Sequence, residues 1–450
     1  METIKNTWAQ LRRYPSAIGG LVVIGLLVVT AIYAVIAIPY NDAIRLWRGG
    51  EEIWYKNPKF AAPEWTNWFS STKQPVSFSA STLAGTMTKQ AGPLAADNTS
   101  SVDIHYSFDF QADGYPQELL LYFTTKFVTK APFATMSWIT PDGRKMNLGN
   151  LNLDQKLTYR FSQDPKLQNL LGPDVMQGLF ADPQDPLVNS PRPLKGKYQL
   201  IISGTTFEKG SDIDAEFVFQ GQVYGLAGTD QARRDLMVPL LWGTPIALAF
   251  GIFASLATIF LSLIIATIGS WYGGWVDELI QRLTEINLVL PFLSILIMIA
   301  TFFNRSIWTI LGTTILLSIF TGSIKQYRAQ LLQLKESMYI EAARAYGASD
   351  RRIIFQYLIP RMIPLLIPLL VSSVPAFVFL EASLALLGLG DPVLPTWGKI
   401  INDAETNGAL YKGYYYWIME PAALLMITGL GFAMLGFALD RIFNPRLRDM

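Results

Sequence analysis

Six uncharged hydrophobic stretches run along the chain and predict membrane-spanning helices. A helix needs about 20 mostly apolar residues to cross roughly 30 Å of hydrocarbon, and each stretch approaches or reaches that length. The stretches cover residues 17–38, 246–270, 286–303, 306–324, 362–380 and 421–439. The pattern therefore predicts a polytopic α-helical membrane protein with six spans, the second preceded by a shorter apolar approach.

The first stretch follows Lys5, Arg12 and Arg13. A cleaved signal peptide has the same order of charge and apolar residues, but its apolar core is usually about 7–15 residues long and ends at a small-x-small site. The run here is longer and lacks a clear site of that kind. We therefore interpret it as a first span, and the arginine pair as a topology signal rather than a twin-arginine export motif.

The basic residues of the short loops predict the orientation. Cytoplasmic loops carry an excess of Lys and Arg, and a cytoplasmic amino end places most of these residues on one side. The side that this choice makes cytoplasmic holds Lys5, Arg12, Arg13, Arg282, Lys325, Arg328, Lys335, Arg344, Arg351, Arg352, Arg361, Arg441, Arg446 and Arg448. The short outer loops hold only Arg305, Lys399 and Lys412. Both termini are expected in the cytoplasm, with the protein in the plasma (inner) membrane.

The polar segment 41–231 then lies outside the cytoplasm, and its pattern is that of strands. In residues 102–110 every second residue is apolar or aromatic, a period of two that buries one face of a strand. Similar runs occur at 118–128, 134–140, 157–162, 197–204 and 214–219. We expect an antiparallel β-sandwich of jelly-roll type, with a turn at residues 141–143 and a less regular Pro-rich stretch near 164–195.

Composition agrees with a mixed protein and removes several kinds of chemistry. The chain is 51% hydrophobic and 16% charged, with a net charge of +1. It has no cysteine, which excludes disulfides, thiolate metal sites and a cysteine nucleophile. The single histidine, His105, cannot form a multi-histidine metal site and is expected on a solvated strand face. We find no convergent catalytic set, and we expect neither an enzyme nor a nucleic-acid partner.

A polar stretch interrupts the hydrophobic half of the chain between the fourth and fifth spans. Residues 325–361 carry ten charges, and at about 2.5 to 3.5 kcal/mol per charge at a bilayer centre, insertion would cost on the order of 25 kcal/mol or more. The stretch is therefore expected in the cytoplasm. Helix formers in 336–346, a glycine that can end a helix at Gly347, and Ser349 or Asp350 as a cap predict two helices separated by a sharp turn.

Pro360 either closes the second of these helices or occupies the first turn of the next span. The residues alone also allow a plain amphipathic connector, in which Glu341 pairs with Arg344 three residues later. The composition of the stretch is compatible with both interpretations, two helices joined by a sharp turn and a plain connector.

The sequence of this stretch resembles the EAA loop of the membrane subunits of binding-protein-dependent ABC importers. The matching positions are Glu341, Ala342, Ala343, Gly347, Ile359 and Pro360, whereas Tyr357 stands where an aliphatic residue is usual. The dipeptide and oligopeptide permease group is the most similar. Further segments resemble that group in the same order, namely GTDQARRDL (228–236), YGGWVDELIQRL (272–283), LEASLALLGLG with TWG (380–390, 396–398) and NPRLR (444–448).

The resemblance implies a type I importer permease with residues 1–40 and 232–450 as its membrane part and 41–231 as an inserted β domain. In that family two permease subunits form a pathway for peptides or a related solute. Each EAA loop docks on one of two cytoplasmic ATPases, and an extracytoplasmic protein binds the solute. This chain has no G-x-x-x-x-G-K-[ST] phosphate loop, so ATP and Mg²⁺ would be used by partner subunits. The coupling residues would be Glu341, Ala342, Ala343, Gly347, Ser349, Asp350 and Pro360.

Three further residues in or beside the spans are candidates for the pathway or its gating. Pro291 and Pro375 leave backbone carbonyls without their helical partners, which produces either pathway kinks or ordinary packing irregularities. Glu381 is an acid at the outer end of the fifth span, with either a functional role or a structural pairing. A second hypothesis is a membrane-anchored interaction protein whose β domain binds an extracytoplasmic partner or a glycan.

Overall fold

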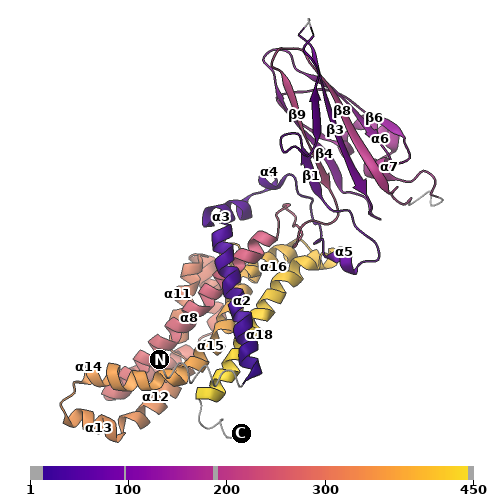
Figure 1. Ribbon diagram of the computed structural model, residues 1–450. Coiled ribbons are helices and arrows are strands. Elements are labelled where there is room, and N and C mark those ends of the chain that lie inside the picture. Colours follow the sequence, from indigo (N-terminus) through magenta and orange to yellow (C-terminus); the bar gives the residue numbers. More distant parts are fainter. Residues whose placement is uncertain (1–13, 96–97, 186–190, 444–450) are drawn as a thin grey trace. The chain divides into compact units, whose positions relative to one another are not determined.

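The computed structural model describes residues 14–95, 98–185 and 191–443, and the chain divides into two compact units (Figure 1). The helical unit comprises Met1–Arg48 and Val238–Met450, and the β unit comprises Gly49–Met237. The amino-terminal basic residues Lys5, Arg12 and Arg13, and the NPRLR segment, lie outside the described residues. We describe each unit by itself.

Among the described residues, the helical unit contains four helices that are long and apolar enough to cross a membrane. They are α2 (Pro15–Ala37), α8 (Met237–Tyr272), the continuous helix Asp350–Leu389 and α18 (Tyr416–Phe443). The third of these is made of α14 (Asp350–Arg352), a π-helical segment (Ile353–Leu358), α15 (Ile359–Leu384) and a second π-helical segment (Ala385–Leu389). The shorter helices are α3 (Tyr40–Arg48), α13 (Met338–Ala345), α16 (Trp397–Thr406) and α17 (Ala409–Lys412).

The third and fourth hydrophobic stretches form bent helix pairs rather than straight spans. The first pair is α9 (Gly274–Val289) with α10 (Phe292–Phe302), bent by 79°, and the second is α11 (Ile307–Ile319) with α12 (Gly322–Lys335), bent by 47°. A single helix over 286–303 is therefore wrong. Pro291 is the cause, because a proline disfavours the helical conformation of the residue before it, and Leu290 is extended at φ −68° and ψ 135°.

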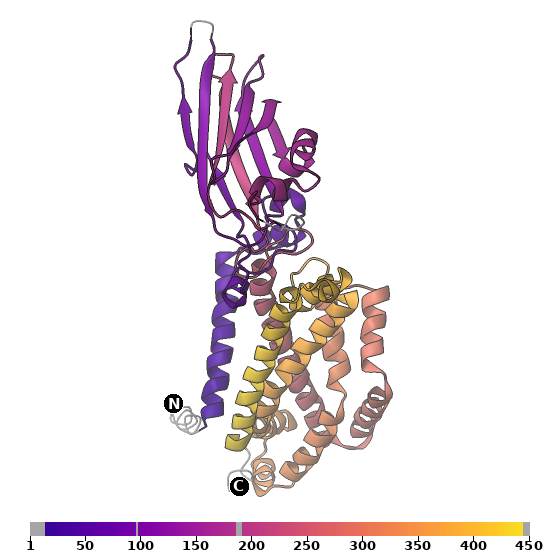
Figure 2. The same cartoon turned by 90° about the vertical axis from the view of Figure 1, so that its right-hand side faces the viewer.

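Small residues let neighbouring helices of this unit approach closely. A Cβ atom on Gly20 of α2 would lie 2.7 Å from the carbonyl oxygen of Gly431 on α18, and α2 and α18 run side by side in both views (Figure 2). A Cβ on Gly251 of α8 would lie 2.6 Å from Val378 of α15. Contacts of this kind are typical of helix packing in lipid, where close backbone approach replaces hydrophobic collapse.

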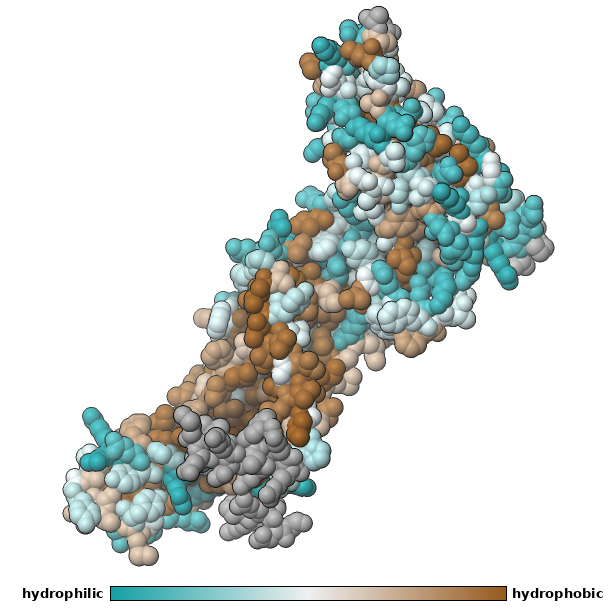
Figure 3. All heavy atoms as spheres, viewed as in Figure 1, coloured by the Kyte–Doolittle hydropathy of each residue, from teal (hydrophilic) through white to brown (hydrophobic). Residues whose placement is uncertain are grey.

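The surface of the helical unit is hydrophobic along its helices and polar at one end. Figure 3 shows hydrophobic residues over most of the length of its helices and hydrophilic residues at the end that carries α13 and α14. Large apolar side chains such as Leu26 and Phe302 are exposed on it. A surface of this kind is suited to a bilayer, and its polar end to water.

The β unit is a sandwich of two antiparallel sheets with strand orders β1-β9-β4-β7 and β2-β3-β8-β5-β6. The strands are β1 (Phe78–Ser81), β2 (Thr88–Ala91), β3 (Ser100–Phe110), β4 (Glu118–Lys126), β5 (Phe133–Ile139), β6 (Lys145–Asn152), β7 (Lys156–Arg160), β8 (Gly196–Thr206) and β9 (Asp212–Gln220). With β2 set aside, the remaining eight strands have the order of a jelly roll. The prediction of an all-β region with six of these strands is confirmed, whereas β1, β2 and β6 were missed.

The two sheets enclose one apolar core, in which residues from facing strands meet. Val102, Ile104 and Phe108 point inward while His105 is exposed, which confirms the period of two and the surface position of the histidine. Phe217 of β9 and Trp138 of β5 are fully buried in this core. Gly143 has φ +85° in the turn between β5 and β6.

The Pro-rich stretch near 164–195 is more regular than the sequence indicates. It contains α6 (Pro165–Leu171) and α7 (Val175–Phe180), whose first turns are capped by the carboxylates of Asp164 and Asp174. The other short elements are α4 (Glu51–Trp54), α5 (Thr66–Phe69) and a 3₁₀ turn (Phe161–Gln163). Capping by Asp164 and Asp174 therefore stabilises two short helices that were not predicted, because the proline content indicated irregular structure.

Candidate functional site

Helix α13 carries the EAA residues at the polar end of the helical unit. Glu341 and Ala342 are exposed, as are Met338 before them and Tyr346 after them, whereas Ile340 is fully buried and Ala343 is nearly so. Glu341 lies in the first turn, where a carboxylate is favoured by the helix dipole. The helix therefore presents an acidic and apolar face outward and fixes itself by the opposite face.

Two interactions hold α13 against the rest of the unit, and a third fixes the end of the preceding helix α12 to α8. Ile340 packs into an apolar cluster that includes residues of α8, α12 and the π-helical segment before α15. The guanidinium of Arg344 lies 4.4 Å from the centre of the Trp271 ring at the end of α8, a cation–π contact. Lys335, at the end of α12, donates to the carbonyl oxygens of Ser270 (3.0 Å) and Trp271 (2.9 Å). The inner face of α13 is therefore in contact with the apolar cluster and with the end of α8.

Arg344 does not serve as the partner of Glu341. Its position over Trp271 replaces the i, i+3 ion pair that a plain connector would have, and the ion pairs of the described residues do not include these two. The contact was missed from the sequence because the two residues lie far apart in the chain. The carboxylate of Glu341 is left available on the outer face of α13.

Gly347 ends α13 by a Schellman motif. Its φ is +77°, and the amide of Ala348 donates to Ala343 at 3.0 Å while the amide of Gly347 donates to Arg344 at 2.9 Å. A residue with a Cβ pays a steric penalty in this left-handed conformation. The sequence prediction of a glycine-terminated helix and a sharp turn is confirmed at this position.

The second helix begins at Asp350 but lacks the predicted side-chain cap. Ser349 occupies the N-cap position with an extended backbone, yet neither its side chain nor that of Asp350 makes a capping hydrogen bond. Pro360 lies in the first turn of α15, which is one of its two predicted positions, and does not close the helix, which continues to Leu389. The helix tolerates this proline beside a π-helical segment, in which the Ile359 amide bonds to the Ile354 carbonyl five residues earlier.

The departure at Tyr357 is accommodated in the same segment. Its ring is half-buried and packs against the apolar cluster that holds Ile340. The side chain therefore contributes to the packing of the second helix and not to the exposed face of α13.

Helices α9 and α12 are joined near this site by a bidentate ion pair. Nε of Arg328 lies 2.7 and 2.9 Å from the two carboxylate oxygens of Asp277, and its Nη2 also contacts the carboxylate. Asp277 belongs to the segment 272–283 that resembles the permease group. Paired arginine and carboxylate groups fix orientation as well as distance, so α9 and α12 hold a defined angle to each other.

The pathway candidates lie apart from α13 and do not form one cluster with it. Pro291 is the N-cap of α10 at the 79° bend, and Pro375 is buried inside α15, where α8 approaches it. Glu381 is buried on α15, with the Thr396 side chain and Asp391 near its carboxyl group. The two alternatives for Glu381, a functional role or a structural pairing, stay predictions.

Asp391 is a capping residue that the sequence did not single out. Its Oδ2 accepts from the amide of Ile307 at 2.9 Å, at the start of α11, and its Oδ1 accepts from the amide of Val393 at 2.8 Å. Trp397 of the TWG segment donates from Nε1 to the carbonyl of Leu240 on α8 at 2.9 Å. These contacts give Asp391 and Trp397 structural roles, since they attach their segment to α11 and α8.

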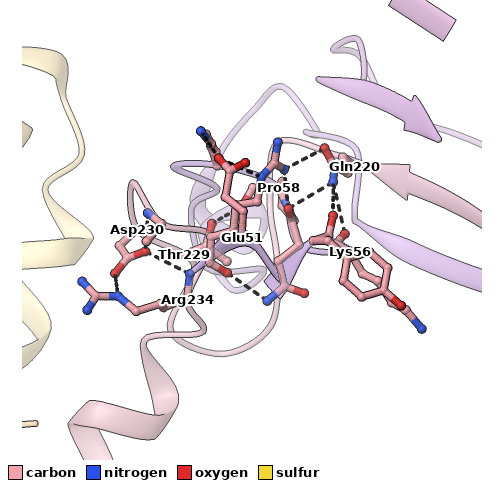
Figure 4. A network of polar contacts seen from close by, with 12 residues as sticks. Glu51, Lys56, Pro58, Gln220, Thr229, Asp230 and Arg234 are labelled. Carbon is pink, nitrogen blue, oxygen red and sulfur yellow. Dashed lines mark hydrogen bonds and ion pairs between the residues drawn. The ribbon is translucent and has the colours of Figure 1, made fainter. Parts of the chain in front are cut away.

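The GTDQARRDL segment forms a polar clamp inside the β unit (Figure 4). The Thr229 hydroxyl accepts from the Ala61 amide (3.0 Å) and donates to the Pro58 carbonyl (2.8 Å). The buried carboxylate of Asp230 accepts from the amide and Nε of Arg234 at 2.9 and 2.5 Å. Burial raises the pKa of the Asp230 carboxyl, and the Arg234 guanidinium opposes that rise.

Two more residues complete the clamp. Nη1 of Arg233 donates to the Asn57 carbonyl at 2.5 Å and to Oε1 of Gln220 at 2.9 Å, and Nε2 of Gln220 donates to the carbonyls of Tyr55 and Asn57, both at 3.1 Å. The chain that enters the β unit and the chain that leaves it are therefore bonded to each other. The sequence indicated the segment by resemblance but not this role.

Comparison with known proteins agrees with these features. The family described as binding-protein-dependent transport system inner membrane component matches residues 258–449. The oligopeptide transport system permease protein OppC of Bacillus subtilis is 31% identical over 226 residues, which cover 49% of this chain and 72% of that protein. The dipeptide transport system permease protein DppC of Bacillus subtilis is 29% identical over 222 residues, covering 49% and 68%.

A third relative is the glutathione transport system permease protein GsiD of Pectobacterium atrosepticum, 28% identical over 223 residues that cover 49% of this chain and 73% of that protein. These relatives are transport permease subunits, not enzymes. The resemblance seen in the sequence is confirmed, and the β unit is compatible with it. This chain therefore belongs to the family of binding-protein-dependent transport system inner membrane components, as a multi-pass permease of the inner membrane whose amino-terminal half contains an all-β region.

Proposed function

We propose that this protein forms one half of the translocation pathway of an ATP-driven importer for peptides or a related small solute. A second homologous permease supplies the other half, two cytoplasmic ATPase subunits use ATP and Mg²⁺, and an extracytoplasmic protein delivers the solute. The relatives named for oligopeptide, dipeptide and glutathione transport support this substrate class. Each bent helix pair counts as one span, which gives six spans in the membrane lipid.

The observation that supports coupling to an ATPase is the two-sided character of α13. Its outer face offers the carboxylate of Glu341, which has no ion-pair partner among the described residues, together with the exposed Ala342 and the turn at Gly347. Its inner face is packed against α8 and α15 through Ile340. A helix that is exposed on one face and fixed on the other transmits a push as a rigid body. Ala342 permits close approach of a basic partner, while Ala343 allows α13 to lie close to its own unit.

The orientation belongs to the same proposal. With both termini and residues 325–361 in the cytoplasm, the β unit faces the other side, where the solute-binding protein works. The excess of basic residues in the loops on the α13 side supports this arrangement. On that side, the β unit would serve as an accessory to docking of the solute-binding protein.

The test is charge reversal at the outer face of α13 in the reconstituted transport complex. Glu341→Lys is expected to insert in the membrane at the wild-type level and to abolish solute-stimulated ATP hydrolysis, because it places a cation against a basic surface. Glu278→Lys is the matched control, since Glu278 is an exposed acid on α9 outside this face. Glu341→Lys with unchanged coupling, or equal losses in both variants, would remove α13 from its proposed role.

A further inference from the structure

The β unit exposes a group of large apolar side chains that its own core does not use. Trp68 and Phe69 of α5 are 79% and 83% exposed, and Leu226 is 66% exposed. The indole of Trp65 joins them, since its ring lies edge-on to Phe69 at 6.3 Å and its Nε1 donates to the carbonyl of Leu226 at 3.0 Å. We call Trp65, Trp68, Phe69 and Leu226 the aromatic patch. Contiguous exposed aromatic residues mark an interaction surface.

The backbone beneath the patch is fixed by hydrogen bonds. Asn67 donates from Nδ2 to the carbonyl of Gln74 and accepts from its amide, both at 2.9 Å. The amide of Glu64 donates to the carbonyl of Gly225 at 2.8 Å, and the Glu64 carboxylate accepts from the amide of Gly225 at 2.9 Å. Trp68 and Phe69 are therefore held outward by a closed loop and do not project by chance from a loose one.

The patch lies at the end of the β unit from which the chain continues into a membrane helix. Leu226 is two residues before Gly228, whose carbonyl accepts from the amide of Leu236 at 3.1 Å, and Thr229 forms a bridge with Asp235. Met237 follows at once as the first residue of α8, which is long and apolar enough to span a bilayer. The contacts between residues 228–229 and 235–236 therefore keep the patch close to the start of α8, and all of these residues belong to the β unit.

We propose that the aromatic patch inserts in the headgroup layer of the bilayer and anchors the β unit to the membrane surface. Tryptophan prefers this layer because its ring is apolar while its N–H finds polar partners there. A cation stands beside the patch, since Nζ of Lys73 donates to the carbonyl of Asn67 at 2.5 Å and remains exposed. Anionic headgroups attract such a charge. Insertion of the patch does not depend on the proposed orientation of the protein. The orientation decides only which leaflet of the bilayer the patch enters.

The absence of cysteine from the sequence makes a site-specific test possible in the full chain. Ser71→Cys, an exposed position two residues after Phe69, is labelled with a fluorophore and the protein is placed in nanodiscs with and without doxyl-labelled lipid. Val128→Cys is the matched control. Val128 follows β4, whose Lys126 pairs with Asp212 at the start of β9, and eight residues of β9 at about 3.4 Å each separate that level from Gln220.

Fluorescence at position 71 is expected to fall by about half with doxyl lipid, as for a probe in the interfacial layer, and to change little at position 128. Adding Trp68→Ser and Phe69→Ser to Ser71→Cys should abolish most of the quenching, whereas Leu83→Ser, in an exposed turn of the same unit, should leave it intact. Equal, weak quenching at 71 and 128 overturns the anchor and indicates a surface for a protein partner instead.

Labelling of Val128→Cys in intact cells by a membrane-impermeant maleimide separates this outcome from a failure of the proposed orientation. If Val128→Cys reacts from outside and Ser71→Cys is not quenched, the anchor alone is wrong. If Val128→Cys does not react from outside, the orientation is wrong, and quenching at position 71 then places the anchor on the other leaflet.

Discussion

The two units solve the same problem of covering apolar surface in opposite ways. In the β unit, Phe217 and Trp138 are fully enclosed between two sheets, while polar residues such as His105 face outward. In the helical unit, residues such as Leu26 and Phe302 are exposed, and small residues such as Gly20 lie where helices meet. The difference reflects the solvent, because water drives apolar side chains together whereas lipid surrounds them as well as a protein core does.

This contrast also separates the polar contacts of the two units. The clamp around Thr229 and Asp230 is buried in the β unit and joins segments far apart in the sequence. In the helical unit, the ion pair of Asp277 with Arg328 joins α9 to α12, and Arg344 of α13 covers Trp271 of α8. Each of these charged groups is thus paired with an opposite charge or an aromatic ring.

Two phenylalanine truncations test the comparison most strongly. Phe217→Ala is expected to destabilise the β unit by about 3–5 kcal/mol, because it removes a buried ring and leaves a cavity. Phe302→Ala, at a residue that is 85% exposed on α10, should change stability by no more than about 0.5 kcal/mol. Thermal unfolding of the full chain in nanodiscs measures both. Similar losses in the two variants would contradict the assignment of lipid to the surface of α10.

Two leucines allow the reverse experiment, in which a charge is added to an exposed position. Leu26→Arg, at a residue 63% exposed in the middle of α2, should oppose membrane insertion by about 2.5–3.5 kcal/mol. Leu83→Arg, at a residue 77% exposed in the β unit, should change stability by about 0.5 kcal/mol or less because water solvates the charge. The fraction of protein recovered in the membrane decides the first and thermal unfolding the second. Normal insertion of Leu26→Arg would exclude α2 from the lipid.

The smallest effect is expected from pH and belongs to the β unit alone. The Thr129 hydroxyl and the amides of Val128, Thr129 and Lys130 donate to the Glu208 carboxylate and lower its pKa from 4.5 to about 2. Because the folded pKa is the lower one, this contribution to stability is present above about pH 4.5 and is lost as the pH falls toward 2.

A spin label on Val128→Cys reports this change as increased mobility of the loop at low pH. In the Glu208→Gln background the mobility should be high and nearly independent of pH over the same range, since the charged acceptor is absent. A label whose mobility rises equally in both backgrounds would show that another group controls the loop.

Much of the helical unit could be predicted from the sequence because its signals are local. The uncharged stretches correspond to α2, α8, α15 and α18. The bend at Pro291 follows from the preference of a residue before proline for an extended conformation, but the uncharged stretch 286–303 had favoured one straight span. The glycine at position 347 predicted the end of a helix, and its φ of +77° confirms the left-handed conformation. The ten charges of 325–361 agree with the polar end seen in Figure 3.

The candidate site was only partly predictable for the opposite reason. The EAA pattern indicated α13, but the contact of Arg344 with Trp271, which fixes α13, joins segments more than 60 residues apart. The same holds for the bonds from Lys335 of α12 to the end of α8. The missing cap at Ser349 and the continuous helix through Pro360 likewise depend on the neighbouring π-helical turn. No local pattern specifies such pairings.

By itself the sequence determined which segments are apolar enough to leave water, where the strand period of two applies, and where glycine permits a sharp turn. Each of these depends on residues close together in the chain. Only the tertiary structure decided that short β1 joins β9 at a sheet edge, that Asp391 caps α11, and that Arg344 covers Trp271 instead of pairing with Glu341. These outcomes depend on which distant groups meet, and packing of the whole unit selects them.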